Sequence, residues 1–120
     1  MTGHDAQLLK GVLSLLLLHL VGDREDYGYS LVVRLQQQGF SDLGEGTVYP
    51  ALTRMQTQGL LSSRLVRSTS GPARKYYRIT SAGEREVGRA LSAWRHLNAS
   101  VDRIIPAATL DLTDHSRSPR

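Results

Sequence analysis

The stretch from Gly46 to Leu61 constrains the fold more strongly than any other part of this chain. Val48, Leu52 and Met55 recur at positions i, i+4 and i+7, and this spacing predicts a helix with one apolar face. Pro50 is compatible with this helix because the N–H that proline lacks has no intrahelical partner in a first turn. The pattern therefore predicts a short helix that packs one side against the protein.

The other side of this predicted helix is polar. It carries Thr47, Ala51, Arg54 and Gln58, and Gly59 is placed to end the helix as a C′ residue. Hydroxyl, guanidinium and amide groups beside a small residue suit base edges and phosphates better than they suit catalysis. We predict that this helix reads DNA.

The distribution of charge supports this interpretation more than the total does. The net charge is +4 and the pI is near 9.9, but no acidic residue occurs between Glu45 and Glu84. The same interval carries six basic residues: Arg54, Arg64, Arg67, Arg74, Lys75 and Arg78. A basic run of this kind, on a candidate reading helix and hairpin, favours nucleic-acid contact over an ordinary solvated surface.

The remaining patterns predict a mainly α fold with a small β-hairpin, arranged as a winged helix-turn-helix with a C-terminal dimerisation helix. Helices are expected at about 5–20, 27–38, 47–58 and 81–100, and strands at 60–66 and 74–79, with the loop tip at 67–73. The expected domains are a DNA-binding domain at 1–80, a dimerisation helix at 81–105 and a flexible tail at 106–120.

Local signals predict where several helices begin and end. Asp26 is the expected N-cap of the second helix, and Gly39 its expected end. Thr80 or Ser81 is expected to cap the last helix, because Ser81 and Glu84 have the spacing of a capping box. Arg78 is expected to pair with a local acid such as Glu84 instead of contacting DNA.

Two apolar surfaces predict a homodimer. The leucine-rich segment 12–21 is shorter than the about 20 residues that span a bilayer, so we expect a core helix and no membrane role. It is apolar nearly all round and needs cover on more than one side. The last helix carries a narrow apolar row that either folds back or pairs with a second chain, and we favour pairing. The expected dimer interface comprises Leu16, Val87, Leu91 and Trp94.

Composition argues against an enzyme. The chain has no cysteine, which excludes disulfides and thiolate sites and fits a cytoplasmic protein. Its four histidines show no partner at a spacing typical of catalysis or metal binding, so we expect neither a metal nor another cofactor. The main alternative to DNA binding is a winged helix that serves as a protein-interaction module.

Several spaced motifs resemble the signature of PadR-type transcriptional regulators. They are Gly46-Thr47-Val48-Tyr49-Pro50-Ala51-Leu52, Gly59-Leu60-Leu61, and the segment from Gly71 to Thr80 followed by Gly83. Leu9-Lys10-Gly11 and Tyr27-Gly28-Tyr29 also resemble the openings of that family's first two helices. The resemblance covers about residues 6–100.

The resemblance implies a dimeric winged-helix repressor that binds a palindromic operator on double-stranded DNA. It places the third helix in the major groove, the wing near the minor groove and the fourth helix against the partner's first helix. Some short members hold flat aromatic drugs near the dimer centre, which implies a small aromatic effector at Trp94. The alternative is that Trp94 is simply part of an interface core. The family's Glu after the recognition-helix Arg-Leu is absent here, since the chain has Arg54-Met55-Gln56.

The residues expected to contact DNA come from the third helix and from the hairpin. Arg54 is expected to meet a guanine or a phosphate, and the start of its helix is expected to face a phosphate. The hairpin cations are expected to contact phosphates or a narrow minor groove. The full expected set is Thr47, Tyr49, Pro50, Arg54, Arg67, Arg74 and Lys75.

Overall fold

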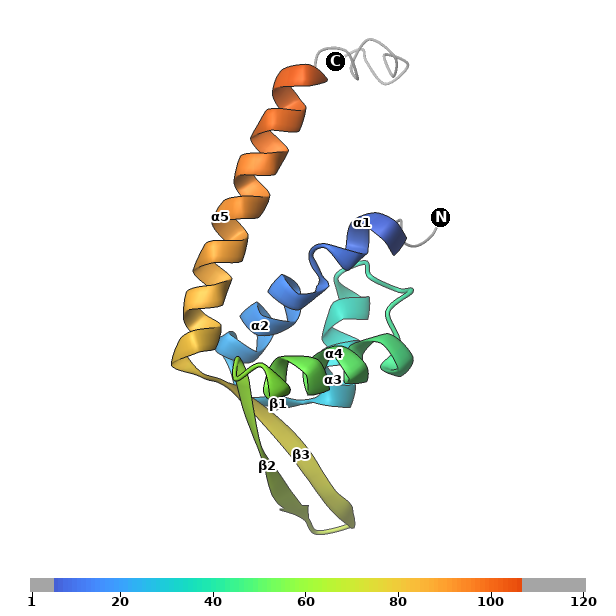
Figure 1. The fold of residues 1–120 in the computed structure, drawn as a ribbon. Helices are drawn as coiled ribbons and strands as arrows, with labels where there is room; N and C mark the ends of the chain where they lie inside the picture. Colours follow the sequence, from blue (N-terminus) through green and yellow to red (C-terminus); the bar gives the residue numbers. More distant parts are fainter. Residues whose placement is uncertain (1–5, 107–120) are drawn as a thin grey trace. The chain divides into compact units, whose positions relative to one another are not determined.

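The computed structural model describes residues 6–106 and confirms a mainly helical fold with a small antiparallel sheet (Figure 1). The elements follow one another as α1 Ala6–Lys10, α2 Leu13–Asp23, β1 Asp26–Tyr27, α3 Gly28–Gln37, α4 Glu45–Thr57, β2 Leu61–Ser68, β3 Gly71–Ile79 and α5 Ser81–Ile104. The chain divides into two units after Gly88, within α5, and each is described by itself. Most of the expected tail at 106–120 lies outside the described residues.

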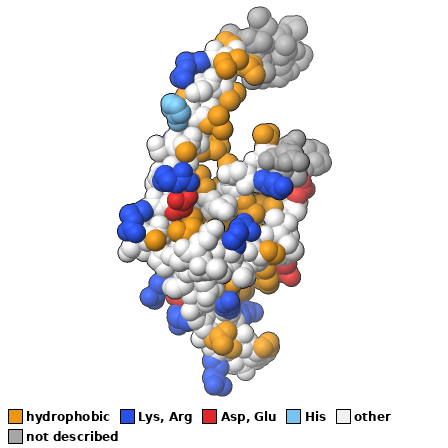
Figure 2. Space-filling model, viewed as in Figure 1, with side chains coloured by type: hydrophobic (Ala, Val, Ile, Leu, Met, Phe, Trp, Pro, Cys, Tyr) orange, Lys and Arg blue, Asp and Glu red, His pale blue; other side chains and the backbone are white. Residues whose placement is uncertain are grey.

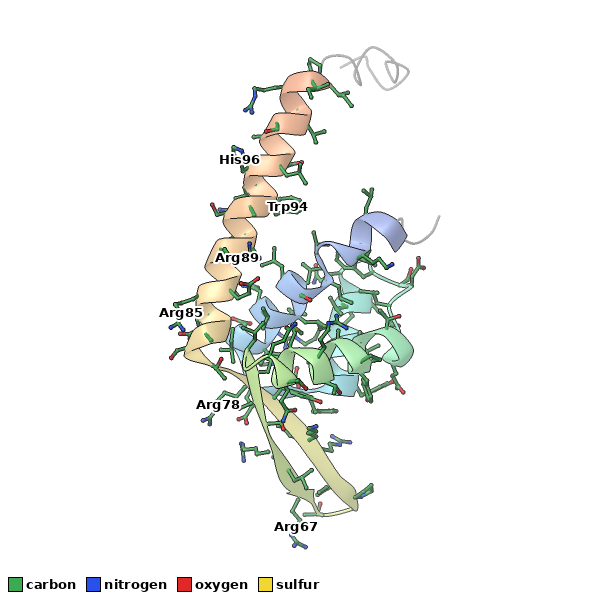
Figure 3. All side chains as sticks on the ribbon, in the orientation of Figure 1. Arg67, Arg78, Arg85, Arg89, Trp94 and His96 are labelled. Carbon is green, nitrogen blue, oxygen red and sulfur yellow. The ribbon has the colours of Figure 1, made fainter. Side chains whose placement is uncertain are left out.

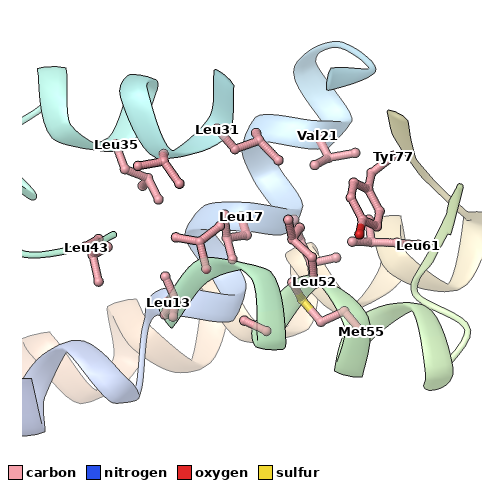
Figure 4. Packing of buried hydrophobic residues seen from close by; sticks show 14 of the residues in the cluster. Leu13, Leu17, Val21, Leu31, Leu35, Leu43, Leu52, Met55, Leu61 and Tyr77 are labelled. Carbon is pink, nitrogen blue, oxygen red and sulfur yellow. The ribbon is translucent and has the colours of Figure 1, made fainter. Parts of the chain in front are cut away.

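Helix α4 is the expected reading helix, and its inner face is fully buried. Val48, Leu52 and Met55 are at most 1% exposed and join a cluster formed with residues of α2 and α3 (Figure 4). Ala51, which we expected on the outer face, is also only 1% exposed. The expectation was wrong because position i+3 from Val48 falls within the same buried arc.

The expected first helix is broken into two. The chain turns at Gly11 and Val12, whose N–H groups donate to Leu8 and Leu9 carbonyls at 3.3 and 3.0 Å. The prediction of one helix at 5–20 was therefore wrong. Glycine is a poor helix former, and its position between two apolar runs marks the break.

Two glycines end helices as the sequence predicts. Gly39 and Gly59 have φ values of 99° and 80°, which only glycine adopts readily. The N–H of the residue after each glycine donates to the carbonyl of the residue five positions earlier. Phe40 donates to the Leu35 carbonyl at 3.0 Å, and Leu60 donates to the Met55 carbonyl at 2.9 Å. This pattern satisfies carbonyls that the helix leaves free, and it confirms both helix ends.

The sheet has three strands in the order β1-β3-β2, and the short β1 was not predicted. In β1, Asp26 pairs with Tyr77 and Tyr27 with Tyr76 of β3. The hairpin is tighter than expected, because strand pairing continues to Ser68 and Gly71. The loop expected at 67–73 is thus mostly strand, and the wing is a long two-stranded ribbon (Figure 1).

Asp26 does not cap α3, contrary to the prediction. The N-cap position belongs to Tyr27, which makes no side-chain cap hydrogen bond. The Asp26 carboxylate, 5% exposed, instead accepts from Arg34 Nη1 at 2.8 Å, Ser30 Oγ at 2.7 Å and the Tyr27 N–H at 2.9 Å. A buried carboxylate needs such partners, and these tie the start of the sheet to α3.

The start of α5 is fixed by Thr80. Its hydroxyl accepts the Gly83 N–H at 3.0 Å and donates to the Gly59 carbonyl at 2.7 Å. Thr80 is therefore the cap, and the capping box expected from Ser81 and Glu84 is not formed. The helix passes so close to Leu60 that a Cβ on residue 83 would lie 2.2 Å from the Leu60 carbonyl oxygen.

This close approach predicts that Gly83→Ala destabilises the protein. Backbone must move to admit the methyl group, and overpacking of this kind costs about 1–3 kcal/mol. The control is Gly88→Ala in the same helix, where a Cβ would meet nothing within 4 Å. Thermal unfolding at one fixed protein concentration should show a lower Tm for the first variant and an equal or higher Tm for the second, because alanine favours helix. Equal Tm values for Gly83→Ala and wild type would contradict the packing described.

Candidate nucleic-acid interface

The outer face of α4 presents the polar groups that the sequence predicted. Thr47, Pro50 and Arg54 are exposed, and so is Thr53. The helix begins at Glu45, so Pro50 lies inside it, in the second turn, and the prediction of a first-turn proline was wrong. Within the described residues, the Arg54 side chain makes no hydrogen bond or ion pair. The helix thus offers a guanidinium and two hydroxyls on the side opposite its buried row.

Tyr49 stands at the edge of this face with 42% of its surface exposed. Partial burial raises the pKa of its phenol above the ordinary value of 10.0, and the nearby Glu45 carboxylate raises this pKa further. The hydroxyl therefore keeps its proton at neutral pH and remains a hydrogen-bond donor. The Tyr49 ring lies against Gly28, where a Cβ would come within 2.6 Å of it. Gly28 is therefore required for this position of the ring.

The wing carries the other expected contacts. Arg67, Arg74 and Lys75 are all exposed, and Arg67 projects from the far end of the hairpin (Figure 3). The Arg74 guanidinium carbon lies 4.5 Å from the centre of the Tyr27 ring, and Lys75 Nζ lies 5.5 Å from that of Tyr77. Basic side chains are spread over this part of the surface (Figure 2). The wing is therefore a cationic ribbon whose inner cations rest on aromatic rings.

Arg64 differs from the other basic residues of the run because it has a carboxylate partner. Its Nε and Nη2 atoms donate to the two Glu25 oxygens at 2.6 and 3.0 Å. This hydrogen-bonded pair lowers the pKa of Glu25 and raises that of Arg64. Arg78 lowers the Glu25 pKa as well and forms no ion pair with Glu84 in the described part of the chain. The even run of positive charge read from the sequence is thus partly neutralised at the base of the wing.

A pocket of about 510 Å³ opens between the start of α3, α4 and β3. We call it the tyrosine pocket, and its lining residues are Tyr27, Gly28, Tyr29, Tyr49, Leu52, Thr53, Arg74, Lys75 and Tyr77. Three of these residues, Tyr49, Arg74 and Lys75, were expected to contact DNA. The sequence predicted no site role for the other three tyrosines, Tyr27, Tyr29 and Tyr77. The repeated tyrosines of Tyr27-Gly28-Tyr29 and Tyr76-Tyr77 were the available signal, but the β1–β3 pairing that brings the two segments together has no signature in the sequence.

The residues expected at a dimer interface fall into both units. In the first, Leu16 and Val87 are half-buried and pack against the core. In the second, Leu91 is half-buried, whereas Trp94 is 44% exposed. An exposed apolar row continues along this part of α5 with Leu97, Val101 and Ile104, and the exposed Ile105 follows directly after the helix. Trp94 and His96 project to different sides of the helix (Figure 3).

Residues 6–106 contain neither a metal site of clustered side chains nor a membrane-spanning helix. No group of three or more histidine, aspartate or glutamate side chains there has an arrangement that would hold a metal ion. None of the helices in that range is both long enough and apolar enough to cross a membrane.

Comparison with known proteins gives consistent results in sequence and in structure. The Transcriptional regulator PadR-like family matches residues 17–89. A PadR-like transcriptional regulator from Bacillus cereus strain ATCC 14579 is 37% identical, with 84% of this chain and 98% of that chain covered and a TM-score of 0.76. Transcriptional regulator Rv3488 of Mycobacterium tuberculosis is 40% identical over 67 residues, which are 56% of this chain and 61% of its own.

Bacillus subtilis PadR, solved in complex with operator DNA, shares the fold with a TM-score of 0.61 at 24% identity, covering 67% of this chain and 46% of that one. The matched family region contains α3, α4 and the whole wing, so it covers the surface described above. The chain therefore belongs to the PadR-like family of transcriptional regulators.

Proposed function

We propose that this protein is a cytoplasmic transcriptional repressor that binds a palindromic operator as a homodimer and is released by a small-molecule effector. The observation that carries the proposal is the pairing of an exposed polar face on a firmly packed α4 with a cationic wing from the same unit. The operator complex of the Bacillus subtilis PadR supports it, because that protein shares the fold.

In this proposal α4 enters the major groove. Arg54 contacts a base edge, and a bidentate arginine–guanine pair contributes about 1–3 kcal/mol of discrimination. Thr47 lies in the first turn of the helix, and Tyr49 and Pro50 follow in the second turn. This end of the helix faces a phosphate, to which the protonated Tyr49 hydroxyl donates. These contacts fix the register on which the Arg54 contact depends.

The wing contributes charge in the same arrangement. Arg67, Arg74 and Lys75 are exposed on one ribbon and contact backbone phosphates or a narrow minor groove. Contacts of this kind strengthen binding to all sequences alike and make it sensitive to salt.

Dimerisation is supported by the apolar surface of α5. Trp94, Leu97 and Val101 are between 44% and 62% exposed, and they recur at the spacing of a helix-packing stripe. In the proposed dimer these side chains pack against a second copy, and Trp94 is the proposed contact for an aromatic effector.

Footprinting on the DNA that flanks the protein's own gene tests the proposed function directly. We expect two protected half-sites related by symmetry, with centres about one helical turn, or a multiple of it, apart. Absence of any protected site at low salt, with DNA-cellulose binding also absent, would reject DNA binding and leave the protein-interaction alternative.

Two substitutions should separate base contact from phosphate contact. Arg54→Ala should weaken binding to the operator more than binding to random DNA, by about tenfold or more, because only a base contact distinguishes sequences. Lys75→Ala should weaken both about equally and reduce the salt slope by about one unit. Fluorescence anisotropy over a salt series measures both quantities. Equal losses on the two DNAs for Arg54→Ala would make Arg54 a phosphate contact.

The Glu25–Arg64 pair predicts a variant that binds DNA more tightly. Glu25→Gln removes a negative charge and frees the Arg64 guanidinium at the base of the wing, so affinity for random DNA should rise about two- to tenfold at low salt. The hydrogen bond from Arg64 lowers the pKa of Glu25 from its ordinary value of 4.5. In the wild type the ion pair is therefore intact at pH values above 4.5, and it is lost as the pH falls through the lowered pKa of Glu25. The control is Glu25→Gln with Arg64→Gln, which should return affinity toward wild type. An unchanged affinity of the single variant would place this part of the wing away from DNA.

The exposed α5 row predicts a variant that dissociates the dimer. Leu97→Glu places a carboxylate among apolar side chains of the proposed interface and should raise the dimer dissociation constant at least about a hundredfold. His96→Glu is the matched control, because His96 projects to a different side of α5 from Trp94 of the proposed interface (Figure 3). Sedimentation velocity at micromolar concentration measures the change. A monomeric wild type, or equal dissociation by both variants, would contradict the proposed interface.

A further inference from the structure

Leu65 is a large apolar side chain that stands exposed in the middle of the cationic wing. It is 72% exposed, whereas the other large apolar side chains of the described strands β2 and β3 are buried or half-buried. Leu61 and Tyr77, at 2% and 7% exposed, lie on the same face of the ribbon, because alternate residues of a strand share a face. The face that packs on the core at the base of the wing therefore continues outward as an uncovered leucine.

Positive charge lies on both sides of Leu65. Its partner across the ladder is Lys75, and Arg67 follows two residues later, where a bulge shifts the pairing. The Lys75 ammonium lies over the Tyr77 ring, toward the base of the wing, which leaves Leu65 uncovered. Neither strand contains an acidic residue, and hydrophobic side chains lie among the basic ones along the wing (Figure 2). The surface thus fits a partner that has a narrow apolar strip between two lines of negative charge.

The size of this apolar surface distinguishes two partners. A specific protein interface buries about 800 Å² on each partner, and a single leucine among cations offers far less apolar area. The minor groove of DNA matches better, because its floor of base edges and sugars is only about 6 Å wide and is bordered by phosphates. Proteins that bind there commonly place leucine or a similar apolar side chain against the bases.

The two kinds of base pair differ in what they present to an apolar side chain on this floor. Both carry hydrogen-bond acceptors, but a G·C pair adds the guanine 2-amino donor. A leucine over that amino group removes its water and supplies no acceptor, so the donor is left unsatisfied. An apolar contact therefore disfavours G·C at the position it covers.

We propose that Leu65 enters the minor groove and selects against G·C pairs beneath the wing, while Lys75 and Arg67 contact the phosphates on either side. This inference rests on the proposed function for its DNA partner, and it adds what the wing reads. Phosphate contacts alone carry no sequence information, so Leu65 gives the wing a preference that its cations do not supply. The sequence reasoning had not placed Leu65 among the DNA-binding residues.

The test uses the full-length protein and three duplex copolymers, poly(dA-dT), poly(dG-dC) and poly(dI-dC). Inosine is guanosine without the 2-amino group, so poly(dI-dC) has the major-groove edges of G·C and the minor-groove edges of A·T. Contacts of α4 in the major groove therefore do not distinguish poly(dI-dC) from poly(dG-dC). In competition measured by fluorescence anisotropy at low salt, the wild type should bind poly(dI-dC) and poly(dA-dT) at least about threefold more tightly than poly(dG-dC).

Variants assign this preference to Leu65. Leu65→Gln supplies an amide oxygen that accepts from the 2-amino group, so the preference should fall below about twofold. Leu65→Met keeps an apolar side chain of similar volume and should keep the preference. The matched control is Ser62→Gln, which puts the same amide on the other face of β2 and should leave the preference unchanged. Both positions are exposed, so folding should persist, and circular dichroism melts check it.

Arg67→Gln tests the competing explanation, because arginine in a narrow minor groove also favours A·T pairs. Loss of the preference in Arg67→Gln, with full retention in Leu65→Gln, would overturn the inference and assign the selection to Arg67. Equal binding of the wild type to all three copolymers would also overturn it, but DNA binding and the proposed function would stand. Failure to bind any copolymer at low salt would reject the proposed function together with this inference.

Discussion

The apolar contact between α4 and the body of the protein is the interaction on which the rest depends. A helix of 13 residues is marginal in water by itself, so α4 is ordered mainly by what it buries. Val48 and Leu52 are 0% exposed, and burial of such side chains contributes about 1.5–3 kcal/mol each. Because this face is fixed in the core, the opposite face has one orientation, and Arg54 and Thr53 project from a rigid support. A recognition surface needs this rigidity, since a mobile helix would lose affinity to the cost of ordering it.

The buried Asp26 fixes the position of the wing relative to α3. Its side chain is bonded to Arg34 and Ser30 of α3, while its backbone pairs with Tyr77 of β3. Loss of one partner would leave a buried charge uncompensated, which costs about 3–5 kcal/mol. The two-residue strand β1 is thus held by a side chain on one side and by the wing on the other. The distance between wing and recognition helix, and with it the shape of the tyrosine pocket, depends on this connection.

The parts of the fold that were predictable are those with local causes. The i, i+4, i+7 row of α4 and the helix-ending Gly39 and Gly59 are properties of neighbouring residues, and all were identified from the sequence. Strand β1 was missed because two residues carry no periodicity and pair with residues about fifty positions away. Asp26 has the residue type and position of an N-cap, so its tertiary pairing with Arg34 overrode the local signal. The candidate site divides in the same way, since its exposed cations were predicted and its tyrosine wall, assembled from three segments, was not.

The basic residues between Glu45 and Glu84 form an even run in the sequence, but their surroundings in the structure differ. Arg64 is held by Glu25, Arg74 and Lys75 rest on tyrosine rings, and Arg54 and Arg67 are exposed. A cation on an aromatic face keeps its charge while part of its hydration is removed, so less water must be displaced when an anion arrives. Arg74 and Lys75 are therefore better prepared for a partner than Arg54 and Arg67, which lie on no ring of the described residues, although all four side chains are exposed and count equally in the net charge. In the proposed interface this difference matters, because Arg74 and Lys75 are the wing cations that a DNA phosphate would meet with part of their hydration already removed.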